Sequence, residues 1–132
     1  MASKFLQIGS AAALLAVVLG AFAAHGLQSK ISADQINVFQ TGVRYQFYHS
    51  FGLFVIAILL DKSKSIWLER AGWAFLIGII LFSGSLYLLS CREWLQLTSW
   101  KWLGPITPIG GTFFILGWAF LFSATFKLKN DE

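Results

Sequence analysis

The sequence predicts an all-α fold, an integral membrane four-helix bundle in which residues 1–132 form a single transmembrane domain. Of the 132 residues, 57% are hydrophobic and only 12% are charged, whereas about 25% of a soluble domain is charged. In addition, four long stretches contain no Asp, Glu, Lys or Arg, namely residues 5–29, 45–60, 71–91 and 102–126. A membrane-spanning helix needs about 20 apolar residues, so we expect four spans.

The first span is expected at about residues 5–27. Its basic Lys4 and the small residues at 21–23 also fit a secretory signal peptide, but the apolar stretch is longer than the roughly 7–15 residues of such a peptide's core. We therefore expect an uncleaved helix. A stripe of small residues recurs every four positions at Ala12, Ala16, Gly20 and Ala24. Such a stripe allows a neighbouring helix to pack closely.

The second span is expected at about residues 43–60. Its charge-free part is too short to cross a bilayer alone, so its helix must begin earlier and include Arg44. Ser32 resembles a helix cap, with Gln35 three residues later, and apolar residues recur at helical spacing across residues 36–47. We therefore expect an amphipathic interfacial segment at about residues 32–42 that runs directly into the second span.

The third and fourth spans are expected at about residues 70–90 and 105–126. Four spans place both termini on one side of the membrane. Basic residues on that side are Lys4, Lys62, Lys64, Arg70, Lys127 and Lys129, against Lys30, Arg44, Arg92 and Lys101 on the other. Since loops rich in Lys and Arg stay in the cytoplasm, we expect both termini to be cytoplasmic.

Polar side chains gather in one half of this arrangement, predicted to be the outer half. The ends of spans one and three and the starts of spans two and four all lie there. The candidate ligand-binding residues are His25, Arg44, Tyr45, Tyr48, His49, Ser83 and Ser85. No Asp or Glu lies within any predicted span, so Arg44 lacks an obvious intramembrane counter-ion. Hydroxyls and imidazoles beside a guanidinium form a donor-rich set that suits a phosphate or carboxylate.

Each of these residues also has a structural interpretation. Arg44 could be an anchor whose guanidinium reaches the lipid headgroups. His25 and His49 could be helix-packing residues with hydrogen bonds, and Ser83 and Ser85 could join helices closely. These interpretations remain open at the level of sequence.

Several classes of protein are disfavoured. The single Cys91 excludes an intramolecular disulfide and a cysteine cluster for metal, so we expect no metal site and no cofactor. A serine nucleophile needs a base and an orienting group, and no carboxylate is available to orient His49, so we do not expect an enzyme. No basic segment clear of the bilayer is long enough to bind nucleic acid.

Four blocks of the sequence resemble a known family. Residues 20–27 read GAFAAHGL, residues 39–49 FQTGVRYQFYH, residues 82–87 FSGSLY, and residues 107–111 TPIGG, followed by Gly117-Trp118. They resemble the signature blocks of the YgdD-like small membrane proteins, a domain-of-unknown-function family with eukaryotic transmembrane relatives. Ala23 stands where that family more often has glycine. The resemblance covers nearly the whole chain and implies a four-helix protein of the bacterial inner membrane, with no established activity.

Three functions follow as expectations. The first is binding of an anionic small molecule or lipid headgroup in the polar pocket. The second is a structural or assembly role in a larger membrane complex. The third is transport of a small solute, which would require a homo-oligomer because one four-helix chain is too small to provide two gated halves. Membrane lipids are the expected partners in each case.

Overall fold

The structure is a computed structural model that describes residues 1–128. Its helices are α1 (Ala2–His25), α2 (Ala33–Lys62), α3 (Ile66–Gly78), α4 (Gly84–Ser90) and α5 (Leu103–Leu128), with a π-helical segment η1 (Ile79–Ser83) between α3 and α4. The α3, η1 and α4 segments form one continuous helix, Ile66–Ser90. The described residues thus form four long helices, each long and apolar enough to cross a membrane. The expected membrane four-helix fold is confirmed.

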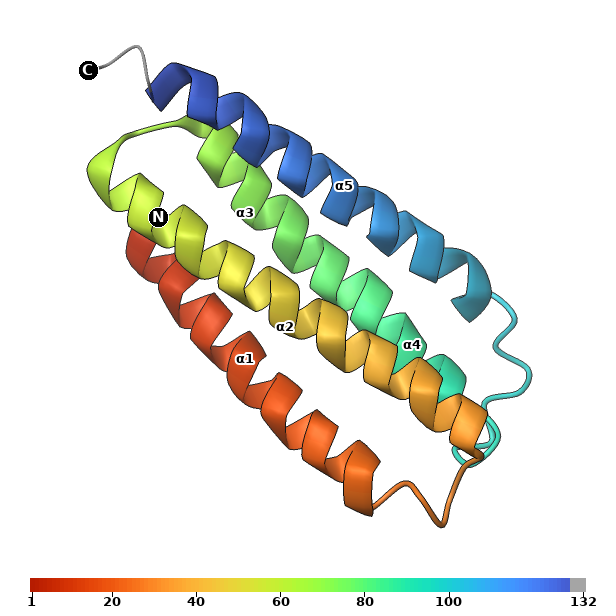
Figure 1. Ribbon diagram of the computed structural model, residues 1–132. Helices are drawn as coiled ribbons and strands as arrows, with labels where there is room; N and C mark the ends of the chain where they lie inside the picture. The colour runs from red at the N-terminus through yellow and green to blue at the C-terminus, as the bar shows by residue number, and fades with distance from the viewer. Residues whose placement is uncertain (129–132) are drawn as a thin grey trace.

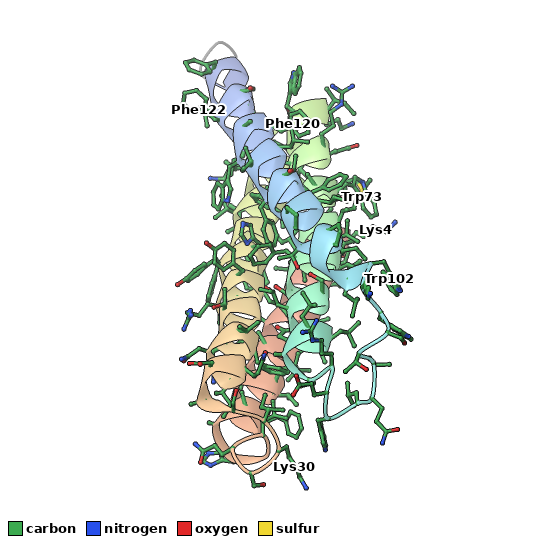
Figure 2. All side chains as sticks on the ribbon, turned by 90° about the vertical axis from the view of Figure 1, so that its right-hand side faces the viewer. Lys4, Lys30, Trp73, Trp102, Phe120 and Phe122 are labelled. Atoms are coloured by element: carbon green, nitrogen blue, oxygen red, sulfur yellow. The ribbon has the colours of Figure 1, made fainter. Side chains whose placement is uncertain are left out.

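The helices run antiparallel, and both ends of the described chain lie at the same end of the bundle (Figure 1). α1 packs along α2, α2 packs along the third helix, and α5 packs along α3 on the other side. At the end with the termini, the ammonium of Lys4 lies 5.4 Å from the centroid of the Trp73 ring, and Figure 2 shows Lys30 at the opposite end. Lys129, which contributes to the predicted orientation, lies outside the described residues.

α2 begins where the sequence predicts. The backbone N–H of Gln35 donates to Ser32 Oγ at 3.3 Å, which satisfies one of the free donors at the helix start. From there α2 continues unbroken through Gly42 to Lys62. The predicted interfacial segment and the second span are therefore one helix.

Small residues bring α1 and α2 into close contact. Ala12 and Ala16 are buried, and a Cβ at Gly9 would lie 2.9 Å from the ring of Phe54. Gly20 faces Val43. The small-residue stripe of the first helix therefore packs largely against α2 of the same chain, so an assembly partner would have to meet another face.

The core consists of two apolar clusters. The larger one lies between α1, α2, α3 and α5 and includes Phe5, Leu53, Leu68, Phe75 and Phe114. The smaller one closes the end remote from the termini and includes Ala23, Leu27, Phe39, Val43 and Cys91.

Buried hydrogen bonds join the helices. Gln46 Nε2 donates to the Ala12 carbonyl of α1 at 2.8 Å, and Gln46 Oε1 accepts from the Tyr87 hydroxyl of α4 at 2.7 Å. Ser83 Oγ donates to the Gly42 carbonyl at 2.7 Å. These bonds connect α2 to both of its neighbours inside the bundle, where an unpaired polar group is costly.

Candidate functional site

A groove runs between α2 and α5 on the outer surface of the bundle. The two helices both pack on the third helix, and the space between them has a volume of about 630 Å³. Its lining residues are Tyr45, Tyr48, His49, Phe82, Pro108, Gly111, Thr112, Phe114, Ile115 and Trp118. Sites for lipophilic ligands are concave, mostly apolar and carry a few polar groups, and the α2/α5 groove has this composition.

His49 lies at the inner wall of the groove and is only 3% exposed. Its Nε2 lies 3.1 Å from Trp118 Nε1, and its Nδ1 lies 2.7 Å from the Tyr45 carbonyl. An indole nitrogen only donates, so His49 Nε2 accepts and the ring proton lies on Nδ1, which donates to Tyr45 O. Both ring nitrogens of a neutral imidazole are therefore satisfied, and the ring is fixed between α2 and α5.

Aromatic rings form one wall of the groove. The His49 ring is stacked on Phe114, with centroids 3.5 Å apart and planes 6° from parallel. Tyr45 packs on Phe82 with centroids 4.6 Å apart, and Phe82 lies 5.4 Å from Phe114. We call Tyr45, His49, Phe82, Phe114 and Trp118 the ring wall.

Glycines allow this wall to form. Phe114 lies against Gly78 of α3, where any Cβ would collide with the ring. α5 also touches the backbone of η1: a Cβ at Gly110 would lie 2.8 Å from the Leu81 carbonyl carbon and closer still to Phe82 N. The π-helical turn thus meets α5 directly and presents Phe82 to the groove.

Two tyrosine hydroxyls near the head of the groove, those of Tyr45 and Tyr48, make no hydrogen bond within the described chain. Tyr45 and Tyr48 are 39% and 56% exposed. Arg44 lies one helical turn from Tyr48 on the same face of α2. Its guanidinium is exposed and donates to Thr41 Oγ1 at 3.0 Å, and it has no carboxylate partner among residues 1–128.

The other predicted site residues lie elsewhere. His25 is exposed in the last turn of α1 and does not line the groove. Ser83 is fully buried against Gly42, and Ser85 Oγ lies 2.6 Å from Thr107 Oγ1 and donates to the Phe82 carbonyl at 2.9 Å. The structure therefore brings together Tyr45, Tyr48 and His49. Arg44 lies one helical turn before Tyr48 and is not among the lining residues, and both serines join helices.

Sequence reasoning missed four residues of this region: Gln46, Phe82, Phe114 and Trp118. A signal existed for two of them. Gln46 is the one side-chain amide in the charge-free residues 45–60, and Trp118 lies in the middle of α5, away from the membrane interface where tryptophan is usually enriched. A buried polar edge of this kind usually has a hydrogen-bond partner. Phe82 and Phe114 carried no comparable signal in a chain with 13 phenylalanines.

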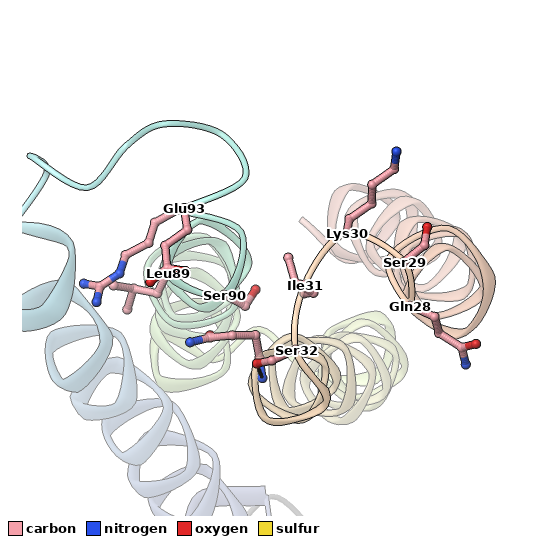
Figure 3. Close-up of a pocket in the computed structure, with 10 residues that line it drawn as sticks. Gln28, Ser29, Lys30, Ile31, Ser32, Leu89, Ser90 and Glu93 are labelled. Atoms are coloured by element: carbon pink, nitrogen blue, oxygen red, sulfur yellow. Dashed lines mark hydrogen bonds between the residues drawn. The ribbon is translucent and has the colours of Figure 1, made fainter.

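A second, polar recess lies at the end of the bundle remote from the termini. It has a volume of about 490 Å³ between the α1–α2 turn and the end of α4. In Figure 3, Lys30 lies on the opposite side of this recess from Ser90 and Leu89, and its side chain points away from them.

No group of three or more His, Cys, Asp or Glu side chains that could hold a metal ion occurs in the described residues.

Four apolar spans, buried interhelical hydrogen bonds and an outward-facing groove define a multi-pass helical membrane protein. The family described as "Protein of unknown function (DUF423)" matches residues 19–111. The chain belongs to this family, as its four sequence blocks predict. No solved structure matches it.

The curated relatives are similar over nearly their whole length. The UPF0382 membrane protein YwdK of Bacillus subtilis is 48% identical over 124 residues, which cover 93% of this chain and 96% of that protein. A UPF0382 membrane protein of Staphylococcus aureus is 47% identical over 126 residues, which cover 96% of this chain and 98% of the relative. These names describe membrane proteins and state no activity.

Proposed function

We propose that the chain binds an anionic lipid, or a small amphipathic anion, with its apolar part in the α2/α5 groove and its headgroup at Arg44. The observation that carries this proposal is the placement of Arg44. It is a guanidinium without a carboxylate partner in the described chain, one turn from the unpaired Tyr48 hydroxyl at the head of an apolar groove.

The depth of Arg44 supports a lipid headgroup as its partner. Asp61, near the other end of α2, follows Arg44 by 17 residues, which is roughly 25 Å along an α-helix. The hydrocarbon core of a bilayer is about 30 Å thick. If Asp61 lies at one interface, Arg44 lies a few ångströms inside the other, within reach of phosphate oxygens.

Native mass spectrometry of protein from nanodiscs containing phosphatidylglycerol and phosphatidylcholine tests the proposal. We expect wild-type protein to retain phosphatidylglycerol. Arg44→Gln should bind it about tenfold more weakly, because charge-assisted hydrogen bonds contribute about 1.5–3 kcal/mol. Arg92→Gln is the matched control, since Arg92 lies at the same end of the bundle, in the polar recess, and is on neither of the helices α2 and α5 that border the groove. Equal losses in both variants would contradict a specific role for Arg44.

The same spectra give the subunit count. A wild-type chain that carries no lipid and is found only with other protein subunits would replace lipid binding with the assembly role. A closed homo-oligomer without retained lipid would favour transport.

The proposed location is the bacterial plasma membrane, with both termini in the cytoplasm. The basic residues near the turn between α2 and α3, Lys62, Lys64 and Arg70, support this orientation under the positive-inside rule. Single-cysteine variants in a Cys91→Ser background test it. A membrane-impermeant maleimide added to intact cells should label Ser99→Cys and should not label Lys64→Cys; the reverse pattern would invert the orientation.

A further inference from the structure

The side chains that line the groove are of a different kind from those exposed along the middle of α1. The exposed large side chains along the middle of α1 are aliphatic: Leu14, Leu15, Val17 and Val18. The groove, by contrast, is lined by five aromatic rings and His49, with Ile115 as the one large aliphatic residue. Aromatic side chains are also exposed singly elsewhere, for example Phe51 and Phe122, but the groove gathers them in one concave site.

Two buried rings behind the groove surface, His49 and Phe114, are held rigidly. His49 is fixed by hydrogen bonds to Tyr45 O and Trp118 Nε1, and its ring stacks on Phe114 at 3.5 Å. Phe114 in turn lies against Gly78 of α3. A preorganised wall loses little side-chain entropy when a ligand binds, so it discriminates between ligand shapes better than flexible aliphatic side chains do.

Flat, rigid faces favour flat, rigid partners. Aromatic rings gain contact energy beyond area burial when they meet other π systems in offset or edge-on geometry. A saturated acyl chain has no π electrons and many rotamers. A polyisoprenoid chain has a planar double bond in every five-carbon unit, so it presents flat segments and has fewer rotatable bonds to order.

We propose, building on the lipid-binding function above, that the groove selects an unsaturated, isoprenoid-type chain attached to the anionic headgroup. The headgroup lies at Arg44 and the Tyr48 hydroxyl, and the double bonds of the chain lie along Phe82 and Trp118, which the buried Phe114 and His49 rings support from behind. The groove volume of about 630 Å³ lies within the usual range for small-ligand sites, about 300–1,000 Å³.

Two probes with one skeleton test this inference. Farnesyl phosphate and hexahydrofarnesyl phosphate share the phosphate, the chain length and the methyl branches, and they differ only in double bonds. Their dissociation constants are measured by native mass spectrometry with the full-length protein in one detergent. We expect farnesyl phosphate to bind about tenfold more tightly to the wild type.

Variants locate the preference in the ring wall. Phe82→Leu should reduce the ratio of the two dissociation constants to near one, whereas Phe122→Leu, on the exposed face of α5 away from the groove, should leave it unchanged. Circular dichroism and thermal unfolding measure whether both variants fold. If Phe82→Leu does not fold, Trp118→Leu provides a second variant of the ring wall.

The outcomes separate the two proposals. Equal binding of both probes by the wild type would overturn the isoprenoid inference and leave anionic-lipid binding intact. No binding of either probe, with phosphatidylglycerol also not retained, would overturn both. A preference that persists in folded Phe82→Leu and Trp118→Leu would place selectivity outside the ring wall and overturn the inference.

Discussion

Gln46 links α2 to two other helices, because the two ends of its amide bond to different helices. Its Nε2 donates to Ala12 O and its Oε1 accepts from Tyr87. We predict that Gln46→Leu lowers the free energy of unfolding by roughly 1–3 kcal/mol, because the Tyr87 hydroxyl loses its partner inside the bundle. Denaturation in mixed detergent micelles, followed by circular dichroism, measures this change.

Tyr87→Phe is the matched variant for Gln46. It removes only the bond between the hydroxyl and Gln46 Oε1, so it should cost less than Gln46→Leu and about 1 kcal/mol or below, as single interhelical hydrogen bonds in membranes do. A larger loss in Tyr87→Phe than in Gln46→Leu would contradict this ordering, because phenylalanine keeps the ring contact with Phe39 and lacks only the hydroxyl.

The bond between His49 and Trp118 is the second residue-scale prediction. His49→Leu and Trp118→Phe should each destabilise the protein, and the double variant should lose about 1 kcal/mol less than the sum, because each single change removes the same bond. Unfolding of the four proteins in this cycle measures the coupling. Strictly additive losses would contradict an energetic role for the bond.

At this scale the sequence predicts contacts within a helix and not those between helices. Tyr45 and His49 are four residues apart, and their rings do lie 6.1 Å apart. The hydrogen-bond partner of His49, Trp118, is 69 residues further along the chain. Whether Trp118 faces His49 depends on how α5 is rotated about its own axis. Helical periodicity contains no information about that rotation.

Among the elements, the approach of α5 to η1 gives the clearest prediction. A methyl group at Gly110 collides with the backbone of Leu81 and Phe82, whereas Gly104, in the first turn of the same helix, has nothing within 4 Å of its Cβ position. Gly110→Ala should lower the free energy of unfolding by about 1–3 kcal/mol or more. Gly104→Ala should be neutral or slightly stabilising, because alanine has the higher helix propensity.

Thermal denaturation of both variants in one detergent tests this pair. Similar melting temperatures for Gly110→Ala and Gly104→Ala would contradict the close approach of α5 to η1. The charge-free stretches indicated where four apolar helices would lie, although α2 and α3 extend past them and include Arg44, Glu69 and Arg70. The π-helical turn was not, since residues 79–83 read IILFS, a composition equally suited to an α-helix.

For the whole molecule, Cys91 reports on global unfolding. The thiol is 4% exposed and packs in the cluster that closes one end of the bundle, and burial raises its pKa. A raised pKa lowers the thiolate fraction at neutral pH, and the thiolate is the reactive form. We predict slow alkylation of Cys91 in the folded protein, a rate that keeps rising above the ordinary thiol pKa, and fast alkylation in denaturant.

The control for Cys91 is the variant Cys91→Ser/Ser99→Cys, whose thiol lies on an exposed loop position and should react quickly without denaturant. Comparable rates for the two thiols in the folded state would mean that the smaller core cluster opens readily.

The fold class and the existence of four spans followed from composition. The order in which the helices pack around the third helix, which creates the groove, depends on side-chain shapes that no single helix specifies.

The π-helical turn also sets the angular phase of everything that follows it in the third helix. The Gly84 N–H bonds to Ile79 O, five residues back, so the turn holds one residue more than an α-helical turn would. If this segment were regularly α-helical with every residue kept, α4 would be rotated by about 100° relative to α3. Ser85 would then turn away from Thr107, and Tyr87 from Gln46. Removing one residue here, for example the outward-facing Ile80, would instead give an α-helical turn with α4 in its present direction, so the π-helical turn compensates for one extra residue.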